Sequence, residues 1–168
     1  MKLRRIVFIS LLIAIASILG YVESLIPITL VPGVKLGLAN IVILFSIYHF
    51  KWYEALIITL IRMVLVSLVL GSFLNVGFFM SLSGGLLSYL LMVLLKNIKN
   101  ISILFVSISG ALVHGLGQIS VAIIVMGASQ VIYYLPLIML LSIPTGVIVG
   151  VLVRELNKHI KLEKEEIE

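Results

Sequence analysis

One long run of the sequence contains no lysine, arginine, aspartate or glutamate. Residues 101–126 read ISILFVSISGALVHGLGQISVAIIVM. As a helix rising about 1.5 Å per residue, this run would extend roughly 39 Å, more than the hydrocarbon thickness of a bilayer. His114 lies near its middle, among small and polar residues. The run therefore predicts a membrane-spanning helix that carries a polar group at mid-depth.

Similar apolar stretches occupy most of the chain. Of its 168 residues, 62% are hydrophobic and only 11% are charged, whereas an ordinary soluble domain has roughly 25% charged residues. We expect an all-α integral membrane protein, with a compact bundle of six transmembrane helices in residues 1–156 and a charged cytoplasmic tail in residues 157–168. The predicted spans are Ile6–Ile26, Leu36–Phe50, Glu54–Leu70, Phe78–Leu95, Ile101–Met126 and Val131–Val153.

The distribution of lysine and arginine predicts the orientation of the bundle, because cytoplasmic loops are enriched in both residues. With a cytoplasmic N-terminus, Lys35 falls in an external loop and Arg62 inside a span. We therefore expect a multi-pass protein of the cell membrane with both termini in the cytoplasm. The net charge of +5 reflects this asymmetry, and no nucleic acid partner is predicted. The ten cytoplasmic cations are Lys2, Arg4, Arg5, Lys51, Lys96, Lys99, Arg154, Lys158, Lys161 and Lys164.

Two residue types that carry much of protein chemistry are missing from the sequence. It has no cysteine and no aspartate, and all seven acidic residues are glutamates. Without cysteine there is no thiol catalysis, no disulfide and no Cys-ligated zinc or iron–sulfur centre. The sequence also has no phosphate-binding loop of the form G-x-x-x-x-G-K-[ST]. No catalytic residue, metal or cofactor is predicted, and any ATP hydrolysis would come from partner subunits.

Four ionisable residues lie in or beside the apolar spans. A charge at the middle of a membrane helix costs roughly 2.5–3.5 kcal/mol, so such residues are usually paired or face a polar cavity. Arg62 and His114 lie near the middle of their spans, whereas Glu23 and Lys35 lie toward the external side. Arg62 therefore has two possible roles. It either forms a structural ion pair with Glu23 or Glu54, or it binds a ligand.

These four ionisable residues, together with nearby polar residues, predict a net-basic cavity in the external half of the bundle. A basic cavity favours an anionic or carboxylate-bearing ligand. The rest of its lining is expected to be apolar. The predicted substrate-binding residues are Glu23, Lys35, Asn40, Arg62, Asn75, His114, Gln118 and Tyr133, with Tyr134 as a further candidate.

Small residues share one face of the run around His114, because positions three and four apart lie together on a helix. This face is a contact that lets a neighbouring helix approach closely, or the wall of a ligand cavity, or both. Residues 81–88 resemble residues 107–114, so the fourth and fifth spans are expected to pack on each other or on a common pocket. The members of the face are Ser107, Gly110, Ala111, His114, Gly117, Gln118 and Val121.

Two further features predict contacts with other molecules. Residues 27–33 read PITLVPG, and the two prolines favour an extended or turn backbone. This apolar external loop is either a lid that folds over a pocket or a connector in the membrane interface. On the first span, Ser10, Ala14 and Ser17 form a smooth face suited to a helix of a partner subunit.

Several of these residues carry a resemblance to a known family. Residues 32–40 read PGVKLGLAN and residues 83–88 read SGGLLS. With Arg62, Gly110-Ala111, His114 and Gly117-Gln118, they resemble the Gx transporter family, also labelled heptaprenyl diphosphate synthase component I. The resemblance covers nearly the whole chain. That family is in turn similar to the substrate-binding S components of energy-coupling factor (ECF) transporters.

The resemblance implies a fold and a set of partners. In ECF S components, six helices hold a vitamin-like solute near the external face, under the loop that joins the first two helices. A small-residue face on the first helix docks on a transmembrane coupling subunit, which two cytoplasmic ATPase subunits drive. The implied partners are therefore this coupling subunit, the two ATPase subunits and a small-molecule substrate.

The two family labels imply different functions. Polyprenyl diphosphate synthesis needs Asp-rich motifs that hold magnesium and diphosphate, which a chain without aspartate cannot supply. The leading hypothesis is therefore uptake of a small anionic solute by an S-component-like subunit. The alternatives are a non-catalytic membrane subunit associated with prenyl or quinone biosynthesis, and an ion-coupled carrier with Glu23 or His114 as its proton site. A redox-complex subunit is a weaker alternative, because the chain has no cysteine and no histidine pair suited to haem.

Overall fold

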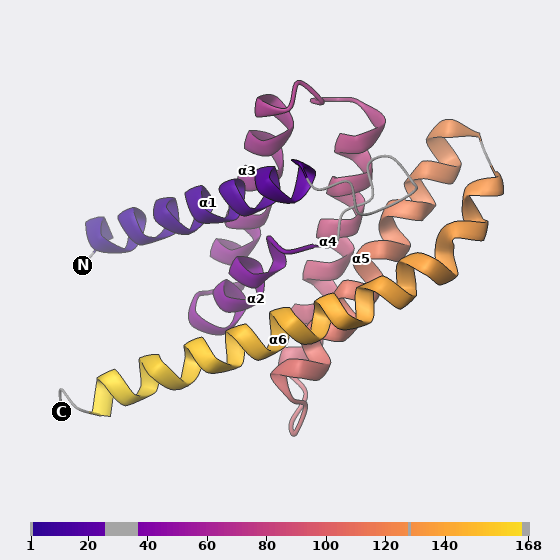
Figure 1. Cartoon of the computed structure of the whole chain (residues 1–168). Helices are drawn as coiled ribbons and strands as arrows, with labels where there is room; N and C mark the ends of the chain where they lie inside the picture. Colours follow the sequence, from indigo (N-terminus) through magenta and orange to yellow (C-terminus); the bar gives the residue numbers. More distant parts are fainter. Residues whose placement is uncertain (1, 26–36, 128, 166–168) are drawn as a thin grey trace.

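Helices account for nearly all of the structure. The computed structural model describes residues 2–25, 37–127 and 129–165, and within these ranges it contains helices and short connections but no strand. In the view of Figure 1, the short α2 lies between the long α1 and α6, and the chain ends marked N and C lie on the same side. The elements are α1 (Lys2–Leu25), α2 (Asn40–His49), α3 (Trp52–Val69), α4 (Val76–Lys96), α5 (Ile103–Met126), the 3-10 helix η1 (Ser129–Tyr134) and α6 (Leu135–Glu165).

Five of the described helices are long and apolar enough to cross a membrane: α1, α3, α4, α5 and α6. Their outward faces carry large apolar side chains, such as Leu94, which is 64% exposed, and Ile124, which is 79% exposed. Apolar surface of this extent suits lipid better than water. The structure thus confirms the prediction of an all-α multi-pass membrane protein with a compact bundle.

The second helix is shorter than predicted and begins inside the bundle. It was expected over Leu36–Phe50, but α2 covers ten residues, about 15 Å in length. Its first residue, Asn40, is buried and accepts a hydrogen bond from Arg62, near the middle of α3. Gly37, just before it, has φ of +90°, a left-handed conformation that favours glycine. The chain therefore enters α2 through a sharp turn at mid-depth.

α2 also helps to form the main apolar core of the bundle. Near Lys96, two hydrogen bonds connect α4 to the neighbouring helices α2 and α3. The Tyr89 hydroxyl donates to the Trp52 carbonyl, and the Lys96 ammonium donates to the Ile47 carbonyl near the end of α2. The core residues come from α2, α3, α4, α5 and α6: Ile43, Leu44, Ile47, Ala55, Tyr89, Met92, Val106, Val149 and Val153.

Glycines bring α4 and α5 into close contact. A Cβ atom added at Gly84 would lie 2.7 Å from the His114 carbonyl oxygen, and one added at Gly117 would lie 2.9 Å from the Gly84 Cα. Distances this short leave no room for a side chain at either position. The expected packing of the fourth and fifth spans on each other is therefore confirmed.

The last helix differs from its predicted span at both ends. The prediction was Val131–Val153, but η1 takes up residues 129–134 and α6 starts at Leu135. α6 then continues to Glu165 without a break, although Pro144 lies inside it. Much of the predicted tail of residues 157–168 is thus a direct extension of the last membrane helix.

Candidate functional site

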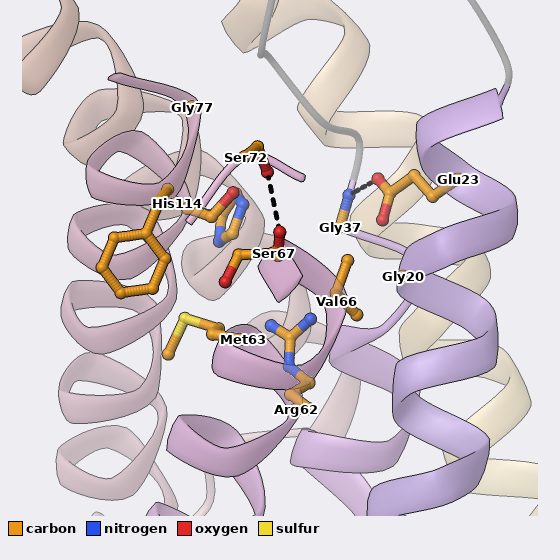
Figure 2. A pocket seen from close by; sticks show the side chains of 12 residues that line it. Gly20, Glu23, Gly37, Arg62, Met63, Val66, Ser67, Ser72, Gly77 and His114 are labelled. Carbon is orange, nitrogen blue, oxygen red and sulfur yellow. Dashed lines mark hydrogen bonds between the residues drawn. The ribbon is translucent and has the colours of Figure 1, made fainter. Parts of the chain in front are cut away.

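A small cavity lies among α1, α3, α4 and α5, and we call it the Arg62 cavity. Its volume is about 30 Å³. This is room for one or two water molecules, well below the roughly 300–1,000 Å³ of a typical small-molecule site. Figure 2 shows the side chains that line it. They are Gly20, Glu23, Gly37, Arg62, Met63, Val66, Ser67, Ser72, Gly77, Phe78, Ser81 and His114.

Arg62 is the central charged group of this cavity. The residue is 8% exposed, and its Nη2 atom lies 3.5 Å from the Asn40 Oδ1 atom that it donates to. Glycines on two flanking helices lie beside the guanidinium. A Cβ atom at Gly20 of α1 would lie 3.8 Å from Nη1, and one at Gly85 of α4 would lie 3.8 Å from Nη2. The positive charge is therefore held between α1 and α4, in the interior of the bundle.

Glu23 provides the negative charge on the opposite wall. It is 5% exposed, interacts electrostatically with Arg62, and accepts a hydrogen bond from the Gly37 backbone N–H. Figure 2 shows this bond, with the Arg62 guanidinium pointing toward the space between Glu23 and His114. Glu23 thus ties the end of α1 to the turn that precedes α2.

Glu54, the other acidic candidate, has a different partner. Its Oε2 atom lies 2.6 Å from Arg5 Nη2 and 3.0 Å from the Lys51 backbone nitrogen. Glu54 lies eight residues before Arg62, which separates the two by about 12 Å along α3. Of the two acids considered for Arg62, Glu23 is the one that shares its cavity.

His114 belongs both to a helix contact and to the lining of the Arg62 cavity. Its backbone oxygen contacts α4 at Gly84, and its side chain lines the Arg62 cavity. Gln118, one turn further along α5, is fully buried, and its Cγ would lie 2.9 Å from a Cβ atom at Gly84. Gln118 therefore belongs to the α4–α5 contact and does not line the Arg62 cavity.

The remaining predicted ligand-binding residues do not gather at this cavity. Asn75 lies at the exposed N-cap of α4, and Tyr133 of η1 is 81% exposed. Tyr134, also in η1, is 39% exposed. Lys35 and the predicted lid loop Pro27–Gly33 lie outside the described residues. The structure thus brings together Glu23, Arg62 and His114, with Asn40 bonded to the edge of the group.

The cavity also contains hydroxyl groups that the sequence did not single out as ligand-binding. Ser67 and Ser72 line it, and the Ser72 hydroxyl donates to the Ser67 carbonyl at 3.4 Å. Ser81 lines it from α4. Serine is a weak signal in a membrane helix because it can bond to its own backbone, as Ser67 does to the Val64 carbonyl at 2.8 Å.

The predicted partner-contact face of α1 is open in this chain. Ser10 and Ala14 are exposed, and Ser17 is half-buried with its hydroxyl donating to the Ile13 carbonyl at 2.8 Å. The buried side of α1 is a different one, which packs on α2 and α3 through Leu12, Ala16 and Gly20. No other helix of the described chain covers Ser10 or Ala14.

Comparisons with known proteins yielded one match. A family model described as "Heptaprenyl diphosphate synthase component I" matches residues 12–156. This range contains the described residues of the Arg62 cavity and most of each helix. No curated protein and no solved structure shows a significant match to the chain.

Proposed function

The chain belongs to the heptaprenyl diphosphate synthase component I family, and from this premise and the Arg62 cavity we propose that it is the substrate-binding subunit of an uptake transporter. It binds a small, vitamin-like anionic solute in the membrane bundle. The observation that carries this proposal is the position of Arg62: a buried guanidinium in a small cavity among four membrane helices.

Arg62 suits an anion for physical reasons. A guanidinium presents several N–H donors in a fixed plane that matches a carboxylate or phosphate. In the low dielectric of a membrane bundle, charge attraction is stronger than in water. His114 and the hydroxyls of Ser67 and Ser81 line the same cavity and supply further hydrogen-bonding groups.

Binding requires this cavity to widen, since about 30 Å³ is too small for a solute of vitamin size. α1 is the helix best placed to move. Of the five spans it is the least buried: only 22% of the residues in its most apolar stretch are buried inside the protein. Its contact with α3 includes Gly20 against Val66, where α1 presents no side chain to α3. Displacing α1 would separate Glu23 from Arg62 and leave the guanidinium for the solute.

The energy for uptake would come from partners. The sequence has neither a phosphate-binding loop nor aspartate for a magnesium site, so we propose that the subunit has no catalytic activity of its own. A transmembrane coupling subunit, driven by two cytoplasmic ATPase subunits, would dock on the open face of α1. Ser10, Ala14 and Ser17 would form that contact, because small residues allow helices to approach closely.

The description of the family favours a second candidate function. It names a component of heptaprenyl diphosphate synthase, so the chain could instead be a non-catalytic membrane subunit associated with prenyl or quinone biosynthesis. The two functions differ in their partners. Purification with ATPase subunits would support transport, whereas purification with a soluble prenyltransferase would support the second function.

Native mass spectrometry of the protein purified from its own membranes tests the proposal, because it detects bound solute and partner subunits together. We expect the wild-type protein to retain an anionic solute. Arg62→Gln should reduce the retained fraction about tenfold or more, the effect of losing a hydrogen bond to a charged group.

Arg5→Gln is the matched control. It removes the same charge from the same chain, but Arg5 lies beside Glu54 and does not line the cavity. Its solute content should equal that of the wild type. Equal retention by Arg62→Gln and wild type, with both variants inserted in the membrane, would refute the assignment of Arg62.

A further inference from the structure

A second, smaller cavity lies next to the Arg62 cavity, and we call it the Ser107 cavity. Its volume is about 10 Å³, close to the smallest space that can hold a water-sized group. Gly37 and Asn40 line it at the start of α2, Met92 from α4, Ser107 from α5, and Thr145 and Val149 from α6. No described residue of this lining is ionisable, so the cavity differs in chemistry from the Arg62 cavity.

The two cavities are neighbours joined by the turn before α2. Gly37 lines both of them. Asn40 lines the Ser107 cavity, and its Oδ1 atom accepts the hydrogen bond from Arg62, which lines the other. Asn40 would therefore be the residue that lies between a group bound at Arg62 and the Ser107 cavity. The two spaces share the turn residue Gly37, and among the described residues charged side chains line only the Arg62 cavity.

Ser107 is the residue that points to a ligand. It is 3% exposed, and its hydroxyl forms no hydrogen bond within the described part of the chain. Some buried hydroxyls bond to their own helix, as Ser46 does to the Val42 carbonyl at 2.6 Å. The hydroxyls of Ser81 and Ser88 also form no hydrogen bond within the described residues, but neither residue lines the Ser107 cavity. An unbonded hydroxyl inside a membrane bundle costs free energy, which a bound group with a hydrogen-bonding atom would recover.

The lining determines what chemistry fits. The hydroxyl of Ser107 and the amide of Asn40 can donate and accept hydrogen bonds. The Thr145 hydroxyl donates to the Leu141 and Ser142 carbonyls, so it can only accept from a bound group. Met92 and Val149 exclude a larger polar group. A charged group would find no opposite charge among the described lining residues. The cavity therefore suits one small, uncharged oxygen-bearing group.

We propose that the Ser107 cavity is a second subsite of the solute-binding site and holds an uncharged hydroxyl or carbonyl group of the solute whose anionic group binds Arg62. This inference rests on the proposed function. It narrows the substrate class to anions that also carry an uncharged oxygen-containing group at a distance from the charge. Asn40 lies between the two subsites and contacts both ends of the solute.

The test is native mass spectrometry of the purified protein, with fragmentation of the retained solute. Ser107→Ala should lower the retained fraction about fivefold, the effect of losing one hydrogen bond. Ser46→Ala is the matched control, because Ser46 is equally buried but lines neither cavity. It should retain solute as the wild type does. Fragmentation should identify an anion that also carries a hydroxyl or carbonyl group.

The outcomes separate this inference from the proposed function. If Arg62→Gln loses solute and Ser107→Ala keeps it, the Ser107 cavity holds water alone and the subsite is refuted, while the proposed function stands. A retained anion whose remainder is pure hydrocarbon would also refute the subsite. If wild type and Arg62→Gln retain solute equally, or if the wild type retains none, the proposed function itself is contradicted.

Discussion

At the scale of single residues, the feature that matters most is a pair of opposite charges inside the membrane bundle. Glu23 and Arg62 are each more than nine-tenths buried and line one cavity. Removing one partner of a buried pair leaves an uncompensated charge, which is costly, whereas removing both can be nearly neutral. Glu23 also accepts the Gly37 N–H, so it has a structural role besides the electrostatic one.

Glu23→Gln should therefore lower stability by about 3 kcal/mol, because Gln keeps an acceptor for Gly37 but leaves Arg62 without its counter-charge. The double variant Glu23→Gln/Arg62→Gln should be more stable than Glu23→Gln alone. Thermal unfolding in detergent, followed for all four proteins of the cycle, measures the coupling. Strictly additive effects would show that the two charges do not interact.

The Arg5–Glu54 pair should behave differently, because it is partly open to solvent. The Arg5 side chain is 47% exposed, and the bond joins the first turns of α1 and α3. Arg5→Ala should cost no more than about 1 kcal/mol, as is usual for exposed ion pairs. The same unfolding assay measures this change. A loss as large as that of Glu23→Gln would mean that this contact holds α1 in place.

At the scale of elements, the bundle is organised by glycines at helix contacts. α4 and α5 approach at Gly84 and Gly117, and α5 and α6 approach where a Cβ atom at Gly146 would lie 2.8 Å from the Ile108 Cα. Van der Waals packing is the main force between helices in lipid, so close contact of this kind is a source of stability. It also sets the position of His114, whose backbone forms part of the contact.

Gly84→Ala should therefore destabilise the bundle by about 1–3 kcal/mol, since its Cβ would meet the His114 carbonyl and force α4 from α5. The control is Gly77→Ala on the same helix, where a Cβ atom would meet nothing within 4 Å. That variant should be as stable as the wild type or slightly more so, because alanine favours helix. Melting temperatures in detergent compare the two. Equal melting temperatures would show that the glycine contact is not limiting.

For the molecule as a whole, the distribution of positive charge predicts one orientation in the membrane. The connection between α3 and α4 includes the exposed Asn75, and that between α4 and α5 begins at the exposed Asn97. These connections lie at opposite ends of α4. Lys96 and Lys99 accompany only the second, which predicts that it is cytoplasmic.

Cysteine labelling tests this orientation, because the native chain has no cysteine and each variant would carry a single thiol. In intact cells, Asn75→Cys should react with a membrane-impermeant maleimide. Asn97→Cys should react only after the membrane is permeabilised. The reverse pattern would place both chain ends outside and would contradict binding of cytoplasmic ATPase subunits.

The amino-acid pattern was enough to predict a helical membrane protein and to identify the ionisable residues inside its apolar spans. The bilayer sets a minimum length for apolar runs, so the helices corresponding to α1, α3, α4 and α5 were predicted close to their actual ends. Arg62 and His114 were identified for the same reason, because an ionisable residue is conspicuous in an apolar run. The small-residue face around His114 likewise predicted the contact with α4, since this pattern is local to one helix.

Only the tertiary structure decided which polar residues meet. The spacing along the chain did not distinguish Glu23 from Glu54 as the neighbour of Arg62; the packing of α1 on α3 did. The late start of α2 at Asn40 depends on the turn at Gly37 and on the bond from Arg62. Asn75 and Tyr133 do not line the cavity, although Ser72, in the same connection as Asn75, does. Such contacts depend on which helix faces pack together, and that is set by the fit of side chains across the whole bundle.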